Sequence, residues 1–342
     1  MDLTLLRELC EINGISGDES RVAQYIIGKI EGFCESWTVD PMGNLLVHKK
    51  GKARAAKKLL FSAHMDEVGM LVTHITDEGY LNLAQIGIDE RVVLGRQVAV
   101  GRDAIPGVIG AKPIHLTKGE DRNAAVKLKD MAVDIGCTSK EEAEKLVSPG
   151  DPVYFVSDFE RLGEKEIKAK AIDDRFGCAV MIELIRSELP YDCWFAFVVQ
   201  EEVGLRGATA AGYTVNPDYV VVLETTASGD QPGVSAPENC CKLGGGVVVP
   251  FMDRGTVYPR GLYRRCLALA KEKGIPVQTK TVIAGGNDAG AYQKARGGAK
   301  CLNLSAAGRC LHTPCVITDL DDMEAVGRLA RELAAFLPEY EE

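Results

Sequence analysis

The sequence lacks the features that mark membrane, nucleic-acid-binding or disordered proteins. Its uninterrupted apolar runs reach about six or seven residues, far short of the roughly 20 that a membrane-spanning helix needs. No basic segment followed by an apolar core opens the chain, so no secretory leader is expected. Basic residues number 40 against 49 acidic ones, and the net charge of −9 argues against binding to nucleic acid or to an anionic membrane surface. A hydrophobic content of 46% excludes disorder.

The cysteines also lack an organised pattern. There are 11 of them, and no pair has the C-x-x-C spacing of a zinc ribbon or a thioredoxin-type site. Apart from the adjacent Cys240 and Cys241, they are scattered singly along the chain. We therefore expect reduced, mostly buried thiols, as in cytoplasmic proteins.

The chain is long enough for roughly two domains. Residues 72–166 are rich in Val, Ile and Gly with frequent turn signals, which favours short strands in a small barrel or sandwich. After Lys170, apolar strands alternate with helical stripes, which is typical of an α/β sheet. We predict an open mixed sheet with helices on both faces, formed by residues 1–71 and 167–342, into which a β-barrel-like domain of residues 72–166 is inserted.

Local patterns predict the individual elements. Helical periods cover residues 3–12, 22–30, 139–146, 176–185, 262–273 and 323–337. Strands are expected at residues 37–39, 44–48, 59–63, 193–199, 219–223, 282–283 and 301–304. The basic run Lys49–Lys58 lacks the glycine spacing of a phosphate-binding loop, and we interpret it as a solvated hairpin tip.

Residue types that bind metals follow five short apolar runs. They are His64 and Asp66, then Asp173 and Asp174, then Glu201 and Glu202, then Glu224, and finally His312. In open α/β sheets, ligands bind beyond the carboxyl ends of the strands, so these side chains are expected to converge. A set of imidazoles and carboxylates suits zinc, cobalt or manganese.

Each member of this set also has an ordinary structural interpretation. The His64–Asp66 pair could form a surface ion pair, Asp174 could cap a helix, and His312 could be a structural histidine. Adjacent glutamates are unremarkable in a chain with 49 acidic residues. The ordered set, with glycines close behind three of its members, favours a metal site.

Several motifs carry a family resemblance. The segments HMDEVG at residues 64–69, IDDR at 172–175, QEEVGLRGA at 200–208 and HTP at 312–314 are present, with NGISG at 13–17 and GGNDAG at 285–290. In these segments the chain resembles the M42 family of dinuclear metallo-aminopeptidases, which includes deblocking, glutamyl and tetrahedral aminopeptidases. The similarity extends nearly from end to end.

The resemblance implies a ligand set for two divalent metal ions per subunit, with Zn²⁺ or Co²⁺ expected and Mn²⁺ as an alternative. Asp173 would bridge the two ions, next to a cis peptide bond between Asp173 and Asp174. His64 and Glu224 would complete one metal site, and Glu202 and His312 the other. Glu224 stands where many relatives have Asp, and its longer side chain can still act as a ligand.

The resemblance also implies an aminopeptidase mechanism in which the metals activate a water that attacks the first peptide bond. Glu201 would be the general base, and Asp66 would hydrogen-bond the far nitrogen of His64. The partners would be short peptides, and the inserted domain would form dimers that build a twelve-subunit shell. A deacylase or dipeptidase with the same metal core, an endoglucanase-type relative and an inactive scaffold remain as alternatives.

Overall fold

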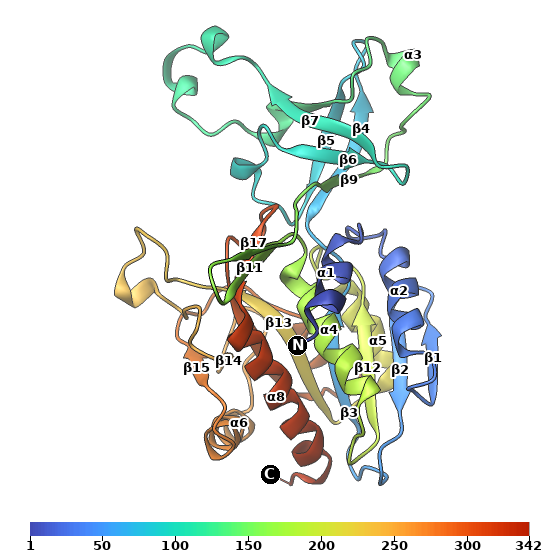
Figure 1. The fold of residues 1–342 in the computed structure, drawn as a ribbon, viewed down its shortest axis with the longest axis vertical. Coiled ribbons are helices and arrows are strands. Elements are labelled where there is room, and N and C mark those ends of the chain that lie inside the picture. Colours follow the sequence, from blue (N-terminus) through green and yellow to red (C-terminus); the bar gives the residue numbers. More distant parts are fainter. Residues whose placement is uncertain (342) are drawn as a thin grey trace.

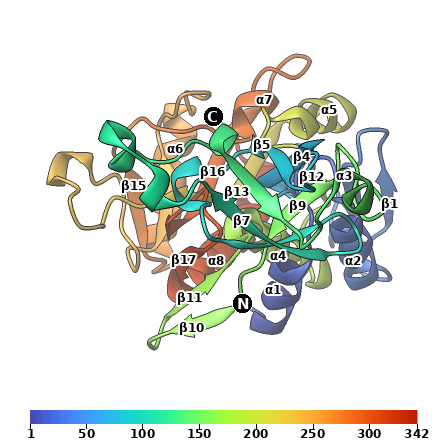
Figure 2. The same ribbon diagram turned by 90° about the horizontal axis from the view of Figure 1, so that it is seen from above.

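The computed structural model describes residues 1–341 and shows a large sheet covered by helices, with a barrel standing at one end of it (Figure 1). Seen from above, the barrel lies over this end of the sheet (Figure 2). The predicted fold, an open mixed sheet with helices on both faces and an inserted barrel, is confirmed. Among the described residues, no helix has the length and apolar character needed to span a membrane.

The large sheet has 11 strands. Its main path is β1 (Ser36–Val39), β2 (Leu45–Lys49), β12 (Cys193–Val198), β3 (Leu59–His64), β13 (Tyr219–Ala227), β16 (Lys300–Arg309), β17 (Val316–Asp319), β11 (Glu166–Ala169) and β10 (Glu160–Leu162). Off this path, β14 (Val247–Pro250) pairs with β16 and with β15 (Val277–Lys280). The central strands β12, β3, β13 and β16 are parallel, so their carboxyl ends lie along one edge.

Alternate residues of β3 explain why helices cover both faces of the sheet. Phe61 packs in the larger apolar core, whereas Leu60 belongs to a separate core on the opposite face. The larger core is formed with α1 (Leu3–Glu11), α2 (Ser20–Ile30), α4 (Ile172–Arg186), α6 (Arg260–Glu272) and α8 (Leu320–Phe336). The other core is formed with α5 (Arg206–Val215) and α7 (Ala289–Tyr292). A strand buried on both faces reads as a continuous apolar run, as LLFSA does.

The barrel is a closed ring of strands with its own apolar core. It consists of β4 (Gly69–Ile75), β5 (Leu81–Ile86), β8 (Met131–Asp134), β7 (Ile105–Ala111), β6 (Gln97–Val100) and β9 (Pro152–Phe155), with α3 (Lys140–Ala143) attached. The chain enters through β4 and leaves through β9, and these two strands are paired. Strands β10 and β11 belong to the large sheet. The domain division at residues 72 and 166 stays a prediction.

Two local predictions were wrong. The strand expected at residues 282–283 lies earlier, as β15, because Val277–Lys280 pairs in parallel with β14 and the chain then leaves the sheet toward a glycine-rich loop. The run Lys49–Lys58 is largely exposed as expected, but it is not a hairpin tip. It connects β2 to β3, and β12 lies between these two strands.

A buried ion cluster joins the segment after β3 to the start of α4. Lys170 Nζ lies 2.7 Å from Glu67 Oε1, and both side chains are buried. The fully buried Arg175 donates to the backbone oxygens of Leu9 at 2.6 Å and Met65 at 2.7 Å. Because a buried charge is stable only when it is paired, these contacts fix the chain on either side of the strand end that carries His64.

Candidate metal centre

The candidate ligands meet at the carboxyl edge of the central strands. In Figure 1 the barrel stands above this edge of the sheet. His64 is the last residue of β3, and Glu224 lies in the carboxyl-terminal half of the neighbouring strand β13. Glu201 and Glu202 follow β12, and His312 follows β16. The parallel order of these strands explains how residues distant in the sequence come to one place.

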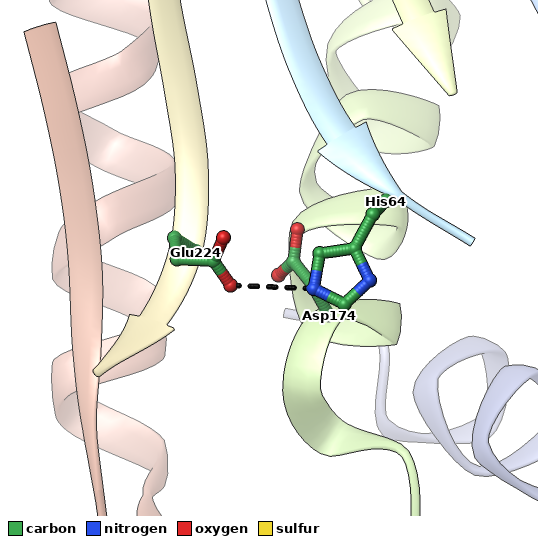
Figure 3. A group of neighbouring side chains, drawn as sticks. All are labelled: His64, Asp174 and Glu224. Atoms are coloured by element: carbon green, nitrogen blue, oxygen red, sulfur yellow. Dashed lines mark ion pairs between the residues drawn. The ribbon is translucent and has the colours of Figure 1, made fainter. Parts of the chain in front are cut away.

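His64 lies at the centre of the group. Its Nε2 atom is 3.4 Å from Asp173 Oδ1 and 3.5 Å from Glu224 Oε1. Figure 3 shows the side chains of His64, Asp174 and Glu224 pointing toward one another from β3, α4 and β13. Among the described residues, two sets of three have ligand atoms within 4.8 Å of one another, namely His64 with Asp174 and Glu224, and His64 with Asp173 and Glu202.

The peptide bond between Asp173 and Asp174 is cis, as the resemblance implied. Asp174 Oδ1 accepts a hydrogen bond of 2.9 Å from the Gly177 amide, which is the helix-capping contact expected for this residue. Its second oxygen, Oδ2, is buried without a hydrogen bond. Asp173 and Asp174 have non-helical backbone angles within the range of α4, so the regular helix begins after them. Asp174 caps this helix and also lies with the candidate ligands, which combines the two interpretations that the sequence left open.

Glu202 and His312 form the other side of the group. His312 Nε2 lies 3.8 Å from Glu202 Oε2, with the Glu202 side chain buried and that of His312 about half exposed. The barrel contacts both residues: the amide of Asp89 donates to the backbone oxygen of His312 at 2.9 Å. A β-carbon at Gly87, which has a φ of +63°, would lie 2.6 Å from Glu202 Oε2. No local pattern in the sequence predicts these contacts.

Two buried carboxylates hold the turn that carries Glu201. The amide of Glu201 donates to Asp66 Oδ1 at 3.0 Å, and the amide of Glu202 to Asp66 Oδ2 at 3.1 Å. The amide of Gln200 donates to Glu19 Oε1 at 3.0 Å. These hydrogen bonds hold the backbone of the turn in one conformation. The backbone in turn orients the side chain of Glu201.

The contact between Asp66 and His64 differs in detail from the predicted hydrogen bond. His64 Nδ1 lies 3.0 Å from the backbone oxygen of Asp66 and 3.5 Å from its carboxylate. The carboxylate also accepts a hydrogen bond of 2.6 Å from the Ser16 hydroxyl. The backbone oxygen is thus the nearer acceptor for the imidazole N–H, and either acceptor leaves Nε2 free to face the carboxylates.

Burial raises the pKa values of the glutamates in this cluster, whereas at Asp173 the contact with His64 outweighs burial and lowers the pKa. Burial raises the pKa values of Glu202 and Glu224 well above the usual range, and the negative charge of Asp173 adds to the effect at both. Burial is also the main cause that raises the pKa of Glu201 to about 8, with a further contribution from the charge of Asp288. Acidic groups crowded in this way ionise fully only when a cation neutralises them.

The residues present fit divalent cations. Imidazole nitrogen and carboxylate oxygen are the donors that zinc, cobalt and manganese accept. Among the described residues, neither Asp173 Oδ1 nor Asp174 Oδ2 has a hydrogen-bond partner, although Asp173 Oδ1 lies 3.4 Å from His64 Nε2. A buried carboxylate oxygen without a hydrogen bond is costly unless it binds a cation.

Asp288 is a further carboxylate near this site to which the sequence assigned no role. It is fully buried, and neither of its carboxylate oxygens has a hydrogen-bond partner in the described part of the chain. Burial raises its pKa to about 7. Asp288 lies in the GGNDAG segment, which contributes to the family resemblance, but no local pattern in the sequence indicates that its side chain is buried.

A cavity of about 300 Å³ opens beside these residues. His64, Asp173, Glu201, Glu224 and His312 form one part of its wall. The rest of the wall comes from the end of β13, the Cys240 segment, the end of β15 and the loop that follows β15. The cavity can admit the end of a peptide next to the candidate metal ligands.

A sequence profile of the M42 glutamyl aminopeptidase family matches residues 43–329. The lysyl aminopeptidase of Pyrococcus furiosus is 30% identical over 345 aligned positions, covering 97% of this chain and 96% of the relative. The crystal structure of a TET aminopeptidase from a marine sediment archaeon has a TM-score of 0.93 at 34% identity, covering 97% of this chain and 95% of the other.

A second solved structure is also closely similar. The TET1 peptidase of Pyrococcus horikoshii, described as able to assemble into a tetrahedron or a large octahedral shell, has a TM-score of 0.87 at 38% identity. The alignment covers 97% of this chain and 98% of that one. The fold and these similarities define a peptidase. The chain belongs to the M42 peptidase family, and it is an aminopeptidase.

Proposed function

We propose that the protein removes N-terminal residues from short peptides and that the reaction requires two divalent metal ions. The observation that carries this proposal is the convergence of His64, Asp173, Glu202 and Glu224, with buried carboxylate oxygens that accept no hydrogen bond, beside a cavity open to substrate. Family membership supports divalent metal use, and Zn²⁺ or Co²⁺ suits this donor set, with Mn²⁺ as an alternative.

The five proposed ligands divide into two groups around Asp173. Asp173 would bridge the ions, His64 and Glu224 would hold one of them, and Glu202 and His312 the other. The short distances from His64 to Asp173 and Glu224, and the contact between His312 and Glu202, support this division. When bound, the ions would lower the pKa of a water molecule and polarise the substrate carbonyl.

Glu201 is the proposed general base. Its side chain lines the cavity but belongs to neither group of converging ligand atoms. The carboxylate would accept a proton from the attacking water and return it to the leaving amine. Asp66 would act on this step indirectly, because it holds the backbone of the Glu201 turn and orients His64.

A panel of aminoacyl anilides tests the activity, with each substrate offered as the free amine and as its N-acetyl derivative. We expect hydrolysis of the free amines only, complete loss in chelator, and recovery with zinc, cobalt or manganese. Release of acetyl groups would favour a deacylase, and cleavage restricted to free dipeptides would favour a dipeptidase. Glycoside hydrolysis that survives chelation would favour the endoglucanase alternative, and full peptidase activity in metal-free protein would contradict the proposal.

We also propose that the barrel mediates assembly into dimers and larger closed shells. The similarity to a TET1 peptidase that forms a tetrahedron supports homo-oligomers, and exposed apolar side chains on the barrel such as Val108, Ile114 and Leu116 support a contact surface there. Light scattering at low protein concentration should give a mass several times that of one chain. A stable monomer with full activity would contradict this prediction.

A cytoplasmic location is part of the same proposal. All 11 cysteines are free thiols in the structure, as expected for a reducing compartment.

A further inference from the structure

The cavity has a lysine in its wall that neither the metal site nor the proposed mechanism uses. Lys280 is the last residue of β15, and its side chain lines the same cavity as His64, Glu201 and Glu224. Among the described residues that form this wall, it is the one lysine or arginine. Because Lys280 and the proposed ligands line one cavity, a substrate that binds beside the ligands also lies near this cation.

Hydrogen bonds hold the ammonium group in place but do not neutralise it. Lys280 Nζ donates to Thr226 Oγ1 and to the backbone oxygen of Ala284, each at 2.9 Å. Both acceptors are neutral, and no carboxylate whose side chain the structure describes forms an ion pair with Lys280. An ammonium group has three donors, so one remains for a ligand.

The surroundings leave room for such a ligand. The cavity wall beside Lys280 consists of small residues, among them Ala284, Gly285 and Gly286. A β-carbon built at Gly286 meets no heavy atom closer than 3.9 Å, so the space there is open. A partly buried cation with two neutral partners gains most from an anionic acceptor, because charge-assisted hydrogen bonds are about twice as strong as neutral ones.

We propose that Lys280 is a specificity-determining residue that binds a carboxylate of the substrate, which rests on the proposed aminopeptidase function. The carboxylate can come from two sources: an acidic side chain on the first residue, or the free C-terminus of a dipeptide. Either source places a carboxylate next to Nζ of Lys280. A neutral or cationic group at this place cannot form the same charge-assisted hydrogen bond. Lys280 thereby favours substrates that carry a negative charge near the scissile bond.

The test compares the metal-loaded wild type with Lys280→Met, which keeps the length of the side chain and removes its charge. The exposed Lys242→Met serves as the matched control, because Lys242 lies in the neighbouring segment but does not line the cavity. The substrates are the anilides of Glu, Gln, Leu and Lys, and the dipeptide Leu-Leu with its C-terminal amide.

In the wild type and in Lys242→Met, kcat/KM should favour a carboxylate substrate over its matched neutral partner by about 10- to 100-fold. Lys280→Met should lose this preference and keep its activity on the neutral substrates. Loss of the preference for Glu over Gln identifies the side chain as the source of the carboxylate. Loss of the preference for Leu-Leu over its amide identifies the C-terminus.

Calorimetric binding gives a second readout that does not depend on turnover. If the acidic side chain is the source, glutamate should bind more tightly than glutamine, and Lys280→Met should remove the difference. If the C-terminus is the source, the amino acid leucine should bind more tightly than leucinamide in the same comparison. Equal loss of activity on all substrates, or carboxylate preferences unchanged in Lys280→Met, would overturn the inference.

Absence of hydrolysis across the whole panel would contradict the proposed function instead, and the binding measurements would still decide the role of Lys280.

Discussion

Glu201→Gln is expected to lower kcat by about 100- to 10,000-fold while the fold and the bound metal are retained. Glutamine has the size of glutamate and keeps hydrogen-bonding capacity, but it cannot accept a proton. The turn that carries residue 201 is held through backbone amides by Asp66, and these contacts do not involve the substituted side chain. The effect should therefore fall on turnover rather than on KM, because the base acts in the transition state.

Glu202→Ala provides the contrast for this experiment. The Glu202 side chain faces His312, so the variant should lose a metal ion as well as activity. Metal content measured on both purified variants, together with steady-state kinetics, separates the two roles. Wild-type turnover in Glu201→Gln would show that another group is the base.

His64→Ala is expected to abolish activity and to remove the thermal stabilisation that added metal gives to the wild type. A ligand that binds only the folded chain stabilises it by about 2.7 kcal/mol at a concentration of 100 times Kd. In this site the gain arises because a cation relieves the repulsion among buried carboxylates. His64 contacts both Asp173 and Glu224, so its removal takes a donor from the centre of the group.

The measurement is a thermal melt of each variant with chelator and with added zinc, cobalt or manganese. His74→Ala is the matched control, since His74 is exposed on the barrel strand β4 and should leave the metal-dependent shift unchanged. A metal-dependent shift of wild-type size in His64→Ala would contradict the assignment of His64 as a ligand.

Much of the site was predictable because parallel strands place their carboxyl ends together. His64, Glu202 and Glu224 each follow or end a buried apolar run, so short-range patterns and one rule of sheet topology were enough to expect them at one place. The helices on both faces followed from the same reasoning, since LLFSA is apolar on both sides.

The other features of the site and the fold depend on contacts between distant segments, which no local sequence pattern predicts. The sequence left open whether Asp174 caps a helix or joins the converging set, and the start of α4 allows both. The burial of Asp288 depends on the packing of α7 against the sheet. The strand β15 was misplaced because Val277–Lys280 reads as mixed polar sequence, and its pairing with β14 comes from a segment far away in the chain.

The way in which the barrel is attached has an evolutionary consequence. The chain enters and leaves the barrel through the paired strands β4 and β9, so both connections lie side by side. An inserted domain attached in this way can be lengthened or exchanged without moving the sheet. The loop that contains Gly87 and Asp89 is more constrained than the rest of the barrel. A side chain at residue 87 would collide with Glu202, and the backbone amide of residue 89 binds the backbone oxygen of His312. A replacement barrel would have to reproduce this short loop, however different the rest of its sequence became.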